Sequence, residues 1–425
     1  MYRSLAAILI ALTLPMRADR VRVVVAVDAP RFSATSAGVL RAHVMDALRT
    51  ARKTEPWGSG PAFAVEVDRS ELELLRLDPR VRAISIDEGG EAALLESVPR
   101  IGADIAHAAG FDGRGVTVAL LDTGIDAKNP DFAGRIVAQQ CFCDNLDGTG
   151  CCPGGDTSQS GGNAAADDNG HGTHVAGIIA SSGASGPQGV APAANIVAVK
   201  VIDSANGFRS FTQIYRALEW IAGSRPDVRV INMSLGSRAL FSTAACGSDA
   251  IALGMRDVIG TLRARGVLIT ASSGNQSSTT GTTLPACMSE VLAIGATYDA
   301  SNAHASMCPE PRIEADQITC FTNSTDAIDL VAPGATIAAS RRGGGSTVLA
   351  GTSMAAPHVA GTIALMQQKG RGRLTADQTE AILKFTGRQV VDPRNGLSFP
   401  RVDAAAAVAA TPDPGPPPRR RSVRK

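Results

Sequence analysis

Five short apolar runs are the feature that most constrains the fold of this chain. The runs are VTVALL from Val116, NIVAVKV from Asn195, RVINMSL from Arg229, VLITA from Val267 and VLAIG from Val291. Segments with helical patterns alternate with them, and runs that are apolar on both faces belong in parallel sheets covered by helices. The sequence therefore predicts the α/β fold class, with a mostly parallel central sheet flanked by helices.

The composition agrees with a large folded domain. The chain has 425 residues, of which 44% are hydrophobic and 19% charged, and its formal net charge is +1. A chain of this length can bury a sizeable core. Because nucleic-acid-binding proteins usually carry a basic surface, a net charge near zero predicts no nucleic-acid partner.

Asp122, His171 and Ser353 each stand in a distinctive local sequence. Asp122 lies just beyond the first apolar run in LLDTGID, while His171 in NGHGTHVAG and Ser353 in GTSMAAPHVAG begin helix-like stretches. Open sheets of this class have their active sites outside the carboxyl ends of the strands. Pro357 fits this pattern if it lies in the first turn of its helix, where no intrahelical hydrogen bond is lost.

The three residue types together can attack an amide carbonyl. A serine hydroxyl is a weak nucleophile until an imidazole takes its proton, and the imidazole needs a carboxylate that fixes its tautomer and stabilises its cation. We therefore expect Ser353 to be the nucleophile, His171 the base and Asp122 the residue that orients the base.

The three strings resemble those of the subtilisin-like (subtilase) serine proteases, over about residues 97–410. Asp, then His, then Ser is the subtilisin order, whereas chymotrypsin and the α/β-hydrolases have other orders. The resemblance implies a three-layer fold and a secreted serine endopeptidase that works through an acyl-enzyme intermediate. It also implies a catalytic asparagine after a buried strand, which is Asn275 in VLITASSGNQ. Its amide and the Ser353 backbone N–H would bind the oxyanion.

Each of these residues also has a structural interpretation. Asp122 could be a turn residue, Ser353 a helix cap and Asn275 a loop residue. His171 and His174 could bind a metal, but they are three apart with no glutamate between them, unlike the zinc-protease pattern. We assign His174 to packing, and the four residues in concert favour catalysis.

The resemblance also predicts how substrate binds. An extended peptide would lie as a strand beside Ser234, Leu235 and Gly236, held mainly by its backbone. The first specificity pocket would be bounded by that stretch and by Ser272, Ser273 and Gly274, with Thr283 near its floor. Small residues leave space there, so we expect an apolar or bulky residue before the scissile bond. These segments hold no acidic cluster, which argues against dibasic specificity.

Two removable segments are predicted at the N-terminus. Arg3 followed by LAAILIALTL, Pro15 and Ala18 predicts an export signal over residues 1–18, because the apolar stretch is too short to span a bilayer. The alternative is a cytosolic protein with an apolar first strand. Residues 19–95 resemble the small α+β propeptide of the family, which assists folding and then blocks the active site.

Within residues 19–95 the patterns predict three strands and two helices. The strands are Arg20–Asp28, Ala62–Asp68 and RVRAISIDE from Arg80, and the helices are Ser36–Arg52 and Ser70–Leu77. A fold dominated by parallel strands forms slowly, so a template that binds native-like surface could accelerate it. We expect cleavage between about Gly89 and Val98, which leaves a catalytic domain of residues 96–410. A permanent N-terminal binding domain is the alternative.

Eight cysteines, an even number, fit the oxidising compartment that an export signal implies. Cys246 and Cys287 flank the Asn275 region and are expected to pair, and Cys308 and Cys320 could close a local loop. The other four, Cys141, Cys143, Cys151 and Cys152, permit several connectivities. A zinc cluster is the alternative for them, although adjacent cysteines do not fit the usual gap in structural zinc sites.

No cofactor is required for the chemistry, but the resemblance raises structural calcium. Asp131 in NPDF matches a position that ligates calcium in some relatives, whereas SSGASGPQG from Ser181 lacks the matching asparagine and supplies few anionic oxygens. A different calcium site could lie in the 142–168 insert, among Asp144, Asp147, Asp156, Asp167 and Asp168. A solvated acidic loop is the alternative.

The remaining predictions concern partners and the C-terminus. Residues 411–425 are proline-rich and then basic, which predicts a disordered tail. We expect protein or peptide substrates, the chain's own propeptide as a partner, an extracellular or periplasmic monomer and no membrane contact after processing. Two rival functions stay open: a catalytically silent pseudoprotease that only binds peptides, and an esterase that uses the same three residues.

Overall fold

The chain divides into two compact units, residues 1–91 and 92–425. The structure, a computed structural model, describes residues 20–28, 34–49, 51–56, 61–86, 94–301, 307–308, 310 and 313–415. The predicted export signal, residues 89–93 of the expected cleavage region and residues 416–425 of the predicted tail lie outside the described residues. Within the described part of the chain, no helix has the length and apolar character needed to cross a membrane.

The N-terminal unit is an antiparallel sheet with helices, in the strand order β2-β3-β1-β4. Its elements are β1 (Arg20–Val27), α1 (Ala34–Asp46), β2 (Arg52–Pro56), β3 (Ala62–Asp68), η1 (Arg69–Glu71), α2 (Leu72–Leu77) and β4 (Val81–Ile86). Every second residue of β1 is buried, as the sequence RVRVVVAV dictates for a strand with one face on a core. These valines pack with Phe63 and Val65 of β3 and with Leu75 of α2.

The predicted helix from Ser36 to Arg52 is wrong at its C-terminal end. Helix α1 ends at Asp46, and β2 is an edge strand that the sequence analysis missed. The Arg49 N–H donates to a Glu71 carboxylate oxygen at 2.9 Å, and β2 then pairs with β3, Pro56 opposite Phe63. Local pattern could not reveal β2, because an edge strand is defined by its pairing partner and needs no regular alternation.

The second unit is built on a ten-stranded sheet, in the order β17-β18-β14-β13-β11-β9-β5-β8-β6-β7. Its strands are β5 (Thr117–Asp122), β6 (Ile136–Phe142), β7 (Ser158–Ser160), β8 (Asn195–Lys200), β9 (Val228–Met233), β11 (Leu268–Ser272), β13 (Leu292–Tyr298), β14 (Leu330–Ala335), β17 (Arg388–Val391) and β18 (Ser398–Arg401). Neighbours from β18 to β6 are parallel, and only the two edge pairs are antiparallel. All five predicted runs form strands of this sheet, so the prediction of a mostly parallel sheet is confirmed.

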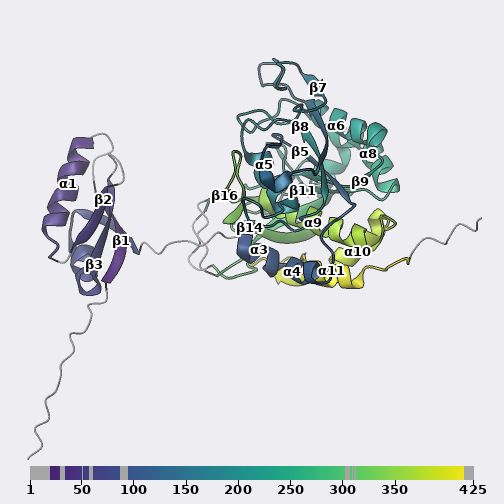
Figure 1. The fold of residues 1–425 in the computed structure, drawn as a ribbon. Helices are drawn as coiled ribbons and strands as arrows, with labels where there is room; N and C mark the ends of the chain where they lie inside the picture. The colour runs from purple at the N-terminus through teal and green to yellow at the C-terminus, as the bar shows by residue number, and fades with distance from the viewer. Residues whose placement is uncertain are drawn as a thin grey trace, which may run out of the picture. The chain divides into compact units, whose positions relative to one another are not determined.

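Helices cover both faces of this sheet and complete three layers (Figure 1). The helices are α3 (Leu94–Arg100), α4 (Ala103–Ala108), η2 (Pro130–Phe132), α5 (His171–Ala180), α6 (Phe211–Ser224), α7 (Thr243–Ser248), α8 (Ala250–Ala264), α9 (Thr352–Lys369), α10 (Ala376–Thr386) and α11 (Ala404–Ala410). Two small two-stranded antiparallel sheets pair β10 (Leu240–Phe241) with β12 (Thr282–Thr283) and β15 (Ile337–Ser340) with β16 (Ser346–Leu349).

Two cores lie on either side of the sheet. Helices α5 and α9 belong to one core, and α6 and α8 to the other. All residues of α5 after His171 are buried, which explains why the helix contains no Asp, Glu, Lys or Arg. Strand β5 lies between β8 and β9, so the order of strands reverses there and leaves a crevice outside the carboxyl ends of the strands.

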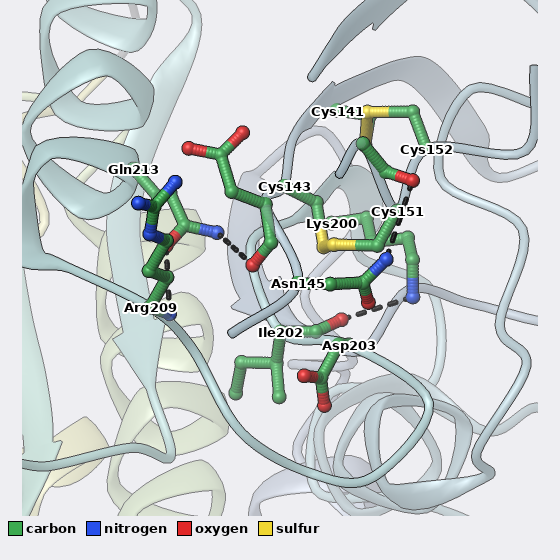
Figure 2. Close-up of a disulfide and its surroundings, with 12 residues drawn as sticks. Cys141, Cys143, Asn145, Cys151, Cys152, Lys200, Ile202, Asp203, Arg209 and Gln213 are labelled. Carbon is green, nitrogen blue, oxygen red and sulfur yellow. Dashed lines mark hydrogen bonds between the residues drawn. A yellow bond between two sulfur atoms is a disulfide. The ribbon is translucent and has the colours of Figure 1, made fainter. Parts of the chain in front are cut away.

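The eight cysteines form four disulfides. Cys246 pairs with Cys287 and Cys308 with Cys320, as predicted. In the cluster that the sequence left open, Cys141 pairs with Cys152 and Cys143 with Cys151, so one disulfide is nested within the other (Figure 2). The Cys151 N–H donates to the Cys143 carbonyl oxygen at 3.0 Å, which shows that the chain folds back on itself here and sets the inner pair opposite each other.

Candidate active site

Asp122 and His171 meet at the crevice beyond β5. Asp122 is the last residue of β5 and His171 the first of α5. The His171 Nδ1 lies 2.7 Å from Asp122 Oδ1; the Asp122 side chain is fully buried and that of His171 is 12% exposed. When Nδ1 donates to a carboxylate, Nε2 is left as the acceptor, which is what a general base requires.

A glycine lets α5 approach β5 this closely. The Gly172 N–H donates to Thr123 Oγ1 at 2.8 Å. A Cβ at Gly172 would collide with the Gly124 carbonyl oxygen and lie 3.1 Å from Asp122 Oδ1. Any larger residue at this position would therefore push the histidine away from its carboxylate partner.

Asp167 is a further acidic residue at this site, and the sequence analysis placed it only in the acidic insert. Its carboxylate accepts hydrogen bonds from the Asn169, Gly170 and Thr173 N–H groups at 2.8–3.0 Å, and from the Thr123 and Thr173 hydroxyls. Burial raises the pKa of Asp167, but these hydrogen bonds outweigh it and lower the pKa below its usual value. An aspartate just before a helix start is the sequence signal that could have identified it.

The two carboxylates set the basicity of the imidazole. Burial by itself lowers the pKa of His171. The charge and hydrogen bond of Asp122, together with the charge of Asp167, outweigh burial and raise the pKa above its usual value. The imidazole is therefore a stronger proton acceptor than a free histidine.

Lys200, the last residue of β8, contacts the residues that follow the carboxyl ends of β5 and β8. Its side chain is fully buried, and Nζ donates to the Thr123 and Ile202 carbonyl oxygens at 2.9 Å and to Asp168 at 2.7 Å. Lys200 lies opposite Cys141 in the β6–β8 pairing, and Figure 2 shows it beside the nested disulfides. These contacts fix the end of β5, which carries Asp122.

Ser353 is the second residue of α9, and Pro357 is the sixth. The expectation that Pro357 lies in the first helical turn is therefore wrong. Proline in a helix removes the donor for the carbonyl four residues earlier, which is that of Ser353. The Ser234 hydroxyl supplies the missing donor at 2.7 Å, so the helix continues without an orphaned carbonyl.

The Ser353 hydroxyl donates to the Ser234 carbonyl oxygen at 3.3 Å. Among the described residues, no hydrogen bond joins it to His171. Ser353, His171 and Asn275 line one cavity of about 180 Å³. A rotation of the serine side chain must therefore precede any proton transfer to the imidazole.

Two hydrogen bonds hold the oxygen of the Asn275 side-chain amide. The Thr352 N–H and hydroxyl donate to its Oδ1 at 2.9 and 3.0 Å. The Nδ2 group is consequently free to donate to an oxygen in the cavity. In the part of the chain that the structure describes, no acceptor meets the Ser353 N–H, so two donors are available together.

The predicted substrate-binding residues divide into two groups. Those that line the cavity with Ser353 are Ser234, Leu235, Gly236, Ser272, Gly274 and Thr283. Ser273 lies behind the cavity wall with a fully buried side chain, and its N–H donates to the Ile294 carbonyl oxygen at 3.0 Å. The lining of this cavity contains no acidic residue.

A larger cavity of about 810 Å³ adjoins His171 without including Ser353 or Asn275. Three exposed cations, Lys128, Arg341 and Arg342, line it together with Asp126. The Arg342 guanidinium donates to the Asp168 carbonyl oxygen at 2.9 Å. The crevice is therefore hollow beyond His171 as well as on the Ser353 side.

Protein donors occupy the carboxylate of Asp131. The Ser185 and Gly186 N–H groups donate to its Oδ1 at 2.7 and 3.2 Å, and the Ser340 hydroxyl donates to Oδ2 at 2.7 Å. Burial raises the pKa of Asp131, but these hydrogen bonds lower it below its usual value. Calcium needs oxygen ligands that point lone pairs at the ion, so these donors do not fit it. Calcium elsewhere in the chain stays a prediction.

Similarity to known proteins identifies the family of this chain. Residues 113–400 match the subtilase family. The chain belongs to this family. It is 36% identical to an alkaline protease of Shouchella clausii, over 73% of this chain and 70% of that protein, and 38% identical to subtilisin Savinase of Lederbergia lenta, over 64% and 86%. A crystal structure of a cold-adapted subtilisin-like serine proteinase superposes with a TM-score of 0.53 at 29% identity, covering 69% of this chain and 90% of that one.

Membership of the subtilase family establishes the enzyme class. The chain is a serine endopeptidase with the three-layer subtilisin-like fold, and its substrates are proteins. The predictions of fold class and enzyme class are therefore confirmed.

Proposed function

We propose that this subtilase is a secreted, self-processing endopeptidase that cleaves peptide bonds with Ser353, His171 and Asp122. The observation that carries the proposal is the 2.7 Å hydrogen bond between His171 and Asp122 beside the cavity that Ser353 and Asn275 line. Ser353 is the nucleophile, His171 the general base and Asp122 the carboxylate that orients it.

Catalysis begins when the Ser353 hydroxyl turns from the Ser234 carbonyl toward His171 Nε2. The imidazole takes the proton as Oγ attacks the substrate carbonyl. Negative charge then forms on the carbonyl oxygen, where Asn275 Nδ2 and the Ser353 N–H donate to it at the positive end of α9. His171 returns the proton to the leaving amine, and a water molecule repeats the sequence on the acyl-enzyme.

We further propose that the 180 Å³ cavity receives the side chain before the scissile bond, and that it prefers an apolar or bulky side chain. Ser234, Leu235 and Gly236 form the extended segment after β9 beside which the substrate backbone pairs. Without a carboxylate in its lining, the cavity offers nothing to neutralise a lysine or an arginine.

The N-terminal unit is proposed to be the propeptide. It has its own sheet and its own core, and the boundary between the units follows Glu91, within the region where we expect cleavage. Self-processing between Gly89 and Val98 separates it from the catalytic domain.

Activity-based labelling tests the nucleophile. A fluorophosphonate probe is expected to label the wild-type protein and Ser398→Ala, whose serine is exposed on β18, but not Ser353→Ala. Cleavage of casein in preference to short esters distinguishes the endopeptidase from an esterase. Labelling that persists in Ser353→Ala would refute the assignment of the nucleophile.

N-terminal sequencing of the secreted protein tests processing. The wild type is expected to start between Gly89 and Val98, whereas Ser353→Ala retains the residues from about Asp19 onward. A cleaved Ser353→Ala protein, expressed in a host without other proteases, would refute self-processing.

A further inference from the structure

The peptide that carries the nucleophile is anchored at its carbonyl group by a side chain from the segment after β9. Pro357 leaves the Ser353 carbonyl without a helical donor, and the Ser234 hydroxyl replaces that donor at 2.7 Å. A serine hydroxyl has one proton and can donate it to any acceptor in reach. A neighbouring group must therefore orient the Ser234 hydroxyl so that its proton points to the Ser353 carbonyl oxygen and not to another oxygen.

Asn232 orients the Ser234 hydroxyl. Its Nδ2 donates to Ser234 Oγ at 3.0 Å, so the oxygen of that hydroxyl is already engaged as an acceptor. The Asn232 amide is itself oriented, because the Thr270 hydroxyl donates to its Oδ1 at 3.0 Å. Thr270 and Asn232 are fully buried and Ser234 is 3% exposed, so water cannot substitute for any member.

We propose that Asn232 is a positioning residue for the nucleophile, acting through the Ser234 hydroxyl on the Ser353 carbonyl. The proposal rests on the function proposed above for Ser353. The hydrogen bonds run in one direction, from Thr270 to Asn232 to Ser234 to Ser353, and they connect β11 and the end of β9 to the start of α9. Because the Ser353 carbonyl is held, its peptide plane is held, and with it the directions of the Oγ and of the N–H that meets the oxyanion.

Positioning predicts losses in kcat and not in KM, because Asn232 does not line the substrate cavity. In Asn232→Asp the carboxylate accepts the Ser234 proton and turns it away from Ser353. We expect kcat to fall about 10- to 100-fold, as for a small misplacement of reacting groups. Asn232→Ala removes the amide without attracting the proton, so it should lower kcat less than Asn232→Asp.

Ser234 variants test whether Asn232 acts through the hydroxyl. Ser234→Ala should lower kcat as much as Asn232→Asp, and Ser234→Thr should restore it because the hydroxyl is kept. In the double variant Asn232→Asp with Ser234→Ala, kcat should equal that of Ser234→Ala alone, because the two residues form one path. A double variant whose loss is the product of the single losses would overturn the proposal.

Thr362→Val is the matched control for folding. Its buried hydroxyl also donates to a carbonyl of α9, that of His358, at 2.9 Å, but far from the nucleophile. Its melting temperature should fall with kcat unchanged. If Asn232→Ala loses more kcat than Asn232→Asp, Asn232 serves packing and the proposal fails. Loss of labelling in Ser353→Ala is measured separately, so failure of the nucleophile assignment is distinguishable.

Discussion

The helices that carry His171 and Ser353 begin at the same crevice, but different groups accept hydrogen bonds from the N–H groups at their N-termini. At α5, the Asp167 carboxylate accepts from the Gly170 and Thr173 N–H groups, so a fixed anion fills the positive end of the helix. At α9, the Thr352 N–H meets only the neutral amide oxygen of Asn275. Neither helix has an acidic residue in its first turn.

The difference follows from what each residue has to do. A base benefits from a permanent negative charge nearby, because the charge raises its pKa and stabilises its cation. A nucleophile that creates an oxyanion benefits from a helix end with no resident anion, because the new charge can use the free N–H groups and the dipole. The N-terminus of α5 therefore holds an anion before the reaction, whereas the N-terminus of α9 meets one only when the oxyanion forms.

The largest expected effect removes a donor from the open end of α9. Asn275→Leu should lower kcat by about 10²- to 10³-fold, or about 3–4 kcal/mol in the transition state, with little change in KM. Steady-state kinetics on a peptide substrate measure both constants. An unchanged kcat would show that Asn275 does not meet the oxyanion and would end the contrast between the two helices.

A second test uses the buried histidine in each helix, His174 in α5 and His358 in α9. Burial is the main cause that lowers the pKa of each to about 4. An unfolded histidine has a pKa of about 6.5, so the unfolded state binds protons first as the pH falls. Stability should therefore be complete above pH ~6.5 and fall by about 1.4 kcal/mol per pH unit per histidine down to pH ~4.

Urea unfolding of Ser353→Ala at pH 7 and pH 5 measures this loss without self-digestion. Adding His358→Gln should shrink the difference between the two pH values, and adding His174→Gln should do the same. If neither substitution changes the pH dependence, the histidines are not neutral in the folded protein. If the two substitutions have unequal effects, the larger effect identifies the histidine that contributes more to the pH dependence of the free energy of unfolding.

The filled end of α5 predicts a moderate effect on stability. Asp167→Asn keeps the shape but leaves one of its oxygens as a donor group facing N–H groups, so we expect a loss of about 1–2 kcal/mol. The pKa of Asp167 is lowered in the fold, so its contribution is present above the unfolded pKa of ~3.9 and is lost as the pH falls further. Urea unfolding at pH 7 measures it, with Asp147→Asn in an exposed loop as control.

The smallest effect is a shift of the pH profile. The protonated imidazole cannot accept the serine proton, so kcat/KM should fall as the pH drops through the raised pKa of His171. Asp167→Asn removes one of the charges that raise this pKa, so the acid limb should move to lower pH. A limb that does not move would mean that Asp167 only caps the helix.

Much of this architecture follows from local pattern. The apolar runs became strands β5, β8, β9, β11 and β13, and His171 is the first residue of α5, as its sequence predicts. The pairing of Cys246 with Cys287 was also predicted. Such features depend on burial and on helix or strand periodicity, which neighbouring residues in the sequence already express.

Other features depend on partners far away in the chain. Strand β2 exists because β3 pairs with it, and Pro357 is tolerated in the second turn of α9 because a serine more than a hundred residues earlier meets the Ser353 carbonyl. Asp167 was only one of several acids in an insert until the fold placed the N–H groups of Gly170 and Thr173, at the start of α5, against it.

The sequence by itself determined the layered α/β fold and the family of this protein, because both are carried by contiguous runs of residues. The tertiary structure alone decided how the cysteines at 141–152 pair, which carboxylate fills the start of α5 and which hydroxyl holds the start of α9. The physical reason is that a hydrogen bond or a disulfide needs atoms within a few ångströms of each other, and only the folded chain fixes that distance.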